Sequence, residues 1–159
     1  ISYLLILIVL FTNIGACNGY KPIFSSSNLE FKITDYSIKG DKKLGNQIYS
    51  RLYNLSQLTK NTSDVKNIYI LINVTKDKKA TAKNSAGKIL AYKINLSTAV
   101  TVKDFITDNQ ILNETFVLTS SYKVQSQHSE TIKSENRSIE NLINETYQNL
   151  LIKLSENIL

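Results

Sequence analysis

Residues 90–103 read LAYKINLSTAVTVK. Every second residue from Leu90 to Val102 is apolar or, at Thr98, β-branched, and polar residues such as Lys93 and Asn95 fall between them. Because side chains alternate between the two faces of a strand, this pattern predicts a half-buried β-strand. A strand of about 15 residues reaches roughly 50 Å, so this element sets the scale of the fold.

Three further strands, a turn and a loop are predicted around this stretch. Residues 112–124 show the same alternation, and Asp108-Asn109 is a turn signal, so the two segments should form a long hairpin. Upstream, residues 67–76 and 29–38 also alternate and predict strands. Between them and the hairpin, residues 76–88 are polar and rich in lysine, which predicts a loop.

Two segments have helical spacing instead. Apolar residues recur every three or four positions in 42–58, behind Asp41 as N-cap, and in 130–157, behind Ser129 as N-cap. The resulting order is β-α-β-β-β-α. We therefore expect an α+β two-layer sandwich, in which two helices cover one face of a four-stranded, mostly antiparallel sheet and the other face is polar.

The composition excludes several classes of function. The chain has 159 residues, 20% of them charged, and a formal net charge of +6, which fits one domain. A single Cys and a single His exclude an internal disulfide, a cysteine zinc site and a multi-histidine metal site. No Gly-rich phosphate loop or G-x-S-x-G elbow occurs, and His128 lies in a polar segment. We expect no cofactor and no enzymatic activity.

The beginning of the chain has the pattern of an export signal. Residues 3–11 are all apolar, which is too short for a stable membrane span but fits the apolar core of a signal peptide. The sequence contains no Met, so we expect the basic start of that signal to lie upstream. Ile14-Gly15-Ala16-Cys17 has the form of a lipobox, with small residues before the only Cys.

This pattern divides the chain into three parts: a signal peptide at 1–16, a lipidated Cys17 with its tether at 17–28, and one domain at 29–159. The alternative is a signal sequence followed by an incidental buried cysteine. Several acyl chains on Cys17 would make a durable anchor. Asn18 rather than Asp after the cysteine favours sorting to the outer membrane, with the domain on the periplasmic side.

The predicted loop 76–88 is the strongest charge signal, with five Lys and one Asp. It lacks the aromatic residues on which single-stranded nucleic acid would stack, and export also argues against nucleic acid. It suits a phosphorylated, anionic glycolipid, with Lys78, Lys79 and Lys83 as candidate contacts. The alternatives are a merely soluble hairpin tip, or a lipid site on the open sheet face around Lys93, Lys103 and Lys123.

Two short motifs resemble the lipopolysaccharide-assembly lipoprotein LptE family. In residues 17–24, CNGYKPIF, the family pattern is a lipidated Cys followed by Gly, an aromatic residue, any residue, Pro, an aliphatic residue and an aromatic residue. In residues 41–48, DKKLGNQI, the Leu-Gly and Gln are similar to the opening of the family's first helix. Asn18 is an extra residue, and lysines stand where the family often has arginine.

This resemblance, which covers the chain after the signal, implies a non-enzymatic role. LptE-like proteins plug the outer-membrane β-barrel LptD, help it to assemble, and bind lipopolysaccharide on its way to the outer leaflet. Two other functions are kept open: an auxiliary lipoprotein of an ABC-type envelope lipid transporter, and a small envelope hydrolase that would depend on His128.

Overall fold

The computed structural model describes residues 30–58 and 65–158. Cys17, the tether and the signal segment lie outside the described residues. The described elements follow the predicted order, and their bounds are β1 Phe31–Gly40, α2 Lys42–Gln57, β2 Lys66–Lys83, β3 Ile89–Asp104, β4 Gln110–Lys123 and α3 His128–Ile158.

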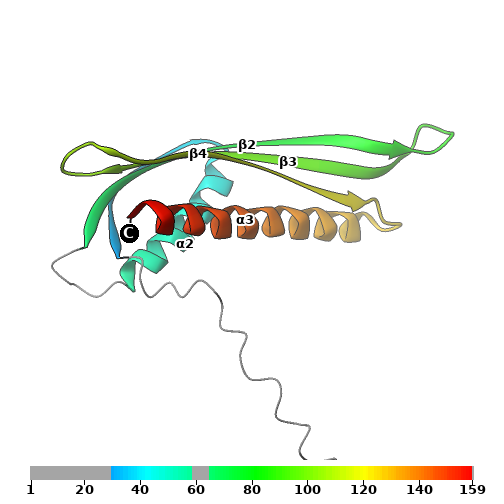
Figure 1. Ribbon diagram of the computed structural model, residues 1–159. Helices are drawn as coiled ribbons and strands as arrows, with labels where there is room; N and C mark the ends of the chain where they lie inside the picture. Colours follow the sequence, from blue (N-terminus) through cyan, green and yellow to red (C-terminus); the bar gives the residue numbers. More distant parts are fainter. Residues whose placement is uncertain (1–29, 59–64, 159) are drawn as a thin grey trace, which may run out of the picture.

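The four strands form one sheet in the order β1-β2-β3-β4. β1 runs parallel to β2, with α2 as the connection between them, while β2, β3 and β4 form antiparallel pairs. Both helices lie on the same side of the sheet, and the long α3 runs beneath β2, β3 and β4 (Figure 1). The prediction of an α+β two-layer sandwich with a mostly antiparallel sheet is confirmed.

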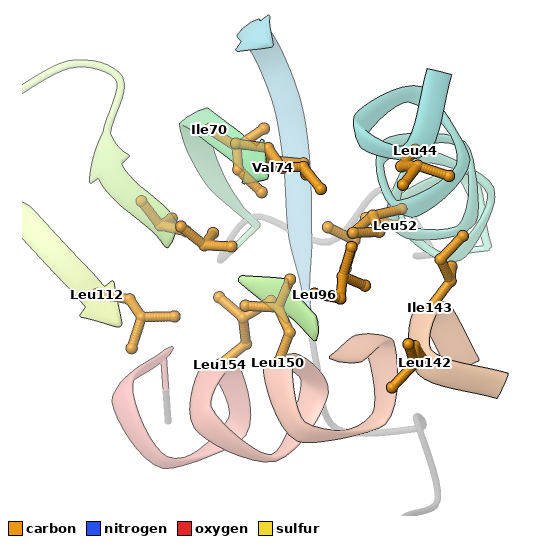
Figure 2. Packing of buried hydrophobic residues seen from close by; sticks show 14 of the residues in the cluster. Leu44, Leu52, Ile70, Val74, Leu96, Leu112, Leu142, Ile143, Leu150 and Leu154 are labelled. Carbon is orange, nitrogen blue, oxygen red and sulfur yellow. The ribbon is translucent and has the colours of Figure 1, made fainter. Parts of the chain in front are cut away.

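The core lies between the sheet and the two helices. Alternate residues of β2 and β3, from Ile68 to Val74 and from Ile94 to Val102, are buried on the helix side. Figure 2 shows Leu142, Ile143, Leu150 and Leu154 of α3 among the side chains of this cluster. Leu150 and Leu154 are fully buried, as the apolar periodicity of the last helix predicts.

The junction between β1 and α2 depends on three residues that allow a tight turn. Gly40 has a φ of +71°, and a Cβ there would lie 2.1 Å from the carbonyl oxygen of Val74. The predicted cap is confirmed, because the Asp41 carboxylate accepts the backbone N–H of Leu44 at 3.1 Å. Gly45 lets α2 approach β1, since a Cβ there would lie 2.5 Å from Ile38.

Two predicted boundaries are wrong. β2 does not end near residue 76 but continues to Lys83, so most of the predicted loop 76–88 is a strand paired with β3. Only residues 84–88 form the turn, in which the Asn84 side chain accepts the N–H groups of Ala86 and Lys88. α3 begins at His128, so Ser129 lies inside the helix and is not its cap.

The extended hairpin divides the molecule into two regions. Residues 79–93, which we call the arm, contain no buried residue, and their tip reaches past the first turn of α3 (Figure 1). The rest of the described chain, which we call the body, contains the whole core.

Candidate functional site

One face of the sheet carries no helix in the described part of the chain (Figure 1). We call it the open face, and strand alternation assigns its residues because their neighbours point into the core. Many of its positions on β2, β3 and β4 are hydroxyl or amide residues, namely Asn73, Thr75, Asn95, Ser97, Thr101, Asn113, Thr115, Thr119 and Ser121. The predicted polar face is therefore present.

The middle of the open face carries no charge across β2, β3 and β4. Three consecutive cross-strand rows contain only neutral side chains, namely Thr75–Ser97–Val117, Asn73–Ala99–Thr115 and Leu71–Thr101–Asn113. In the last row the Thr101 hydroxyl donates to the Asn113 side-chain oxygen at 3.1 Å. Lysines stand on both sides of this neutral area, with Lys93 at the base of the arm and Lys103 toward the opposite end of the sheet.

The three lysines predicted as one lipid-binding group do not lie together. Lys78 is on the helix side of the sheet, in register with the buried Ile94, whereas Lys79 is on the open face opposite Lys93. Lys83 is the last residue of β2, beyond irregular pairing at Ala80 and Ala82. The reason is that a strand, unlike a loop, sends successive side chains to opposite faces.

Lys78 is held at the root of the arm by residues from β3, β4 and α3. Its ammonium donates to the Glu135 carboxylate at 2.6 Å and lies 4.5 Å from the centre of the Tyr92 ring. The Tyr122 hydroxyl donates to the same carboxylate oxygen at 2.7 Å, and its ring stacks on Tyr92. We call these four residues the arm latch.

Hydrogen bonding within the arm latch favours its charged forms. Partial burial works to raise the pKa of Glu135, but the hydrogen bonds from Lys78 and Tyr122 outweigh it and hold that pKa below its ordinary value. Burial works to lower the pKa of Lys78, and the bond to Glu135 reverses this and raises it. Burial raises the pKa of Tyr122. Lys78 is therefore a structural cation with a fixed partner.

The arm latch could not be predicted from the sequence, for a physical reason. Lys78 and Glu135 are 57 positions apart, and nothing in the local pattern of either segment links them.

The other two lysines predicted as lipid contacts are more exposed than Lys78. Lys79 pairs with Asp77 at 3.1 Å and its side chain stays 72% exposed, while Lys83 lies in the exposed part of the arm.

A shallow polar hollow of about 350 Å³ lies between α2 and α3. Its central cation, Arg51, donates to Glu140 and Asn144, so the guanidinium joins the two helices.

His128, the only histidine, is an exposed residue in the first turn of α3. Within residues 30–58 and 65–158, no three of the side chains that bind metals come close enough to hold one ion.

None of the described helices is long and apolar enough to cross a membrane. No family model matches the chain, and no curated protein sequence is significantly similar to it.

Two solved structures share the fold. Lipoprotein B from Nitrosomonas europaea, an uncharacterized protein, superposes with a TM-score of 0.57 at 14% identity, over 84% of this chain and 88% of that one. A candidate lipoprotein from Caulobacter crescentus superposes with a TM-score of 0.53 at 10% identity, over 78% and 89%. At this level of identity, these likenesses establish the fold alone.

Proposed function

We propose that this chain is a lipid-anchored lipoprotein of the outer membrane that sits inside an LptD-like β-barrel, helps it to assemble, and contacts lipopolysaccharide. The observation that carries the proposal is the uncharged middle of the open face. A surface on which hydroxyl and amide groups surround only the apolar Leu71, Ala99 and Val117, and which carries no charge, suits the polar inner wall of a membrane barrel. Neutral hydrogen-bonding groups can pair with such a wall without leaving an unpaired buried charge.

Two further observations support this proposal. The lipobox Ile14-Gly15-Ala16-Cys17 would place an acyl anchor one short tether before β1. The fold is shared with the two lipoproteins named above. The resemblance of residues 17–24 and 41–48 to the LptE family supplies the identity of the barrel and of the lipid.

The arm supplies the lipopolysaccharide contact in this proposal. Lipopolysaccharide carries phosphate groups on its lipid headgroup, and lysine binds phosphate as a point charge. Lys79 and Lys93 are cross-strand neighbours on the open face, and Lys83 extends the positive charge toward the tip. Lys78 is assigned the structural role in the arm latch, because its ammonium already pairs with Glu135.

Co-purification in detergent tests the barrel partner. We expect the parent chain to leave the membrane in a one-to-one complex with a large barrel, and Ser97→Lys to lose it, because the variant buries an unpaired ammonium against the wall. Ser97→Thr keeps the hydroxyl at the same position and should keep the complex. Recovery with an inner-membrane transporter complex would favour the auxiliary lipoprotein of an ABC-type transporter instead.

A further inference from the structure

The β3–β4 turn presents two large apolar side chains to solvent. Phe105 is 49% exposed and Ile106 is 80% exposed, although turns at this position are normally polar. The adjacent described segments leave about half of Phe105 and most of Ile106 uncovered, so packing within the described domain does not account for this exposed apolar surface.

The backbone of this turn has no unpaired N–H group. Five consecutive donors, those of residues 105–109, each have an acceptor. The acceptors are Asn67 O for Phe105 (2.9 Å), the Asp104 carboxylate for Ile106 (2.9 Å) and Thr107 (2.8 Å), Asp104 O for Asp108 (3.0 Å) and Thr107 Oγ1 for Asn109 (3.4 Å). Because its N–H donors are already bonded within the protein, this turn can move from water into a lipid interface without the large free-energy cost of burying unpaired peptide N–H groups.

The turn lies at the end of the sheet where the chain enters the domain. The backbone of Lys66 donates to Glu30, and that of Phe105 donates to Asn67, so Glu30 and Phe105 are separated by about two strand spacings, roughly 10 Å. Figure 1 places the β3–β4 turn and the start of β1 at the same side of the molecule. The 12 residues 18–29 connect Glu30 to Cys17 and reach at most about 45 Å.

The charges around the turn balance. Lys103 pairs with Asp108 at 2.9 Å, and Lys66 lies near Asp104, so two cations meet two carboxylates. A turn with balanced charges has no electrostatic preference for anionic lipid. The exposed carboxylate of Asp108 limits how deeply the turn can insert into a membrane.

We propose that Phe105 and Ile106 insert into the interface of the membrane that holds the lipid anchor, as a second, noncovalent contact that fixes the orientation of the domain. This inference rests on the anchor in the proposed function. The partner is a bilayer surface rather than a protein. Two protruding apolar side chains on a turn whose N–H groups are all bonded can insert between lipid molecules, and they offer no flat area for a protein contact. Zwitterionic lipid should suffice, and salt should not weaken the contact.

A single tryptophan tests this directly, since the chain has none. The lipidated chain carrying Ile106→Trp is reconstituted into phosphatidylcholine vesicles with or without bromine on the acyl chains. We expect the brominated lipid to quench most of the emission at low and high salt alike. Leu90→Trp is the control, because Leu90 is another exposed apolar residue, at 44%, but lies at the opposite end of the sheet. This variant should keep its emission.

Flotation of the same vesicles separates this inference from the anchor. If the chain floats and Ile106→Trp is unquenched, the turn proposal is wrong and the anchor stands. If Cys17→Ala no longer floats, the anchor is supported independently of the turn. If the chain does not float, both are overturned. A blue shift that rises with protein concentration in the absence of lipid would show that a second copy covers the turn, which also overturns the proposal.

Discussion

The body and the arm share two continuous strands and are stabilised by different interactions. In the body, every second residue of β2 and β3 packs on the helices, so backbone pairing and apolar burial reinforce each other. In the arm the same strands continue with no buried residue, and pairing becomes irregular at Ala80 and Ala82. The comparison shows that two strands can remain paired well beyond the apolar core, because each strand supplies the backbone hydrogen bonds of the other.

The largest effect of any single change should come from the body. Leu154→Ala removes a fully buried side chain between α3 and the sheet, and we expect it to lower the free energy of unfolding by about 2–5 kcal/mol. Denaturant unfolding measures this directly. Leu90→Ala, which truncates a Leu in the arm, should change the same quantity by less than about 0.5 kcal/mol. Equal losses would mean that the arm is packed as tightly as the body.

This difference also explains what the sequence could predict. The order and the helix side of the strands follow from alternation in residues such as Ile70 and Leu96, because burial of apolar surface selects the register. The end of β2 at Lys83 did not follow, because residues 77–83 have no apolar face and their strand state depends on pairing with β3. Within the candidate site, the polar open face was predictable from the same alternation, and the arm latch was not.

The arm latch should have an intermediate effect. Glu135→Gln removes the charge that pairs with Lys78, and we expect a loss of about 1 kcal/mol at neutral pH, since the pair is only partly buried. Urea unfolding of both proteins checks the value. Glu130→Gln removes an exposed pair with Lys133 on the same helix and should cost less than about 0.5 kcal/mol.

The pH dependence of this loss has a defined sign. The pKa of Glu135 is lowered in the folded state, so its contribution is present above the unfolded pKa of about 4.3 and is lost as the pH falls through the folded value. The pKa of Lys78 is raised, so its contribution persists until the pH rises through that higher value. The difference between parent and Glu135→Gln should therefore be full at pH 7 and shrink below about pH 4. A difference that stays constant down to pH 2 would contradict the role of the charge.

The smallest effect on folding should accompany the largest effect on ligand binding. Lys79 and Lys83 lie in the arm outside the latch, so Lys79→Glu with Lys83→Glu should change the free energy of unfolding by less than about 0.5 kcal/mol. The same double variant should weaken lipopolysaccharide binding about tenfold, or about 1.4 kcal/mol, and make it less dependent on salt. Titration of the folded proteins with lipopolysaccharide at low and high salt measures both. Lys78 is left unchanged, because its replacement would also open the arm latch.

Net charge is the main competing explanation, and the chain offers a control for it. Lys32→Glu with Lys39→Glu makes the same change in charge on β1, the edge strand farthest from β4, where both residues are exposed. If binding depends on the local charge of the arm, this control should bind nearly as well as the parent, because exposed charges more than about 10 Å away are screened at physiological salt. Equal weakening by the two double variants would mean that overall charge attracts the lipid and that the arm is no site. If the arm variant binds like the parent, Lys79 and Lys83 are not contacts, and the phosphate contacts belong to Lys93 at the base of the arm and to Lys103 and Lys123 on the open face.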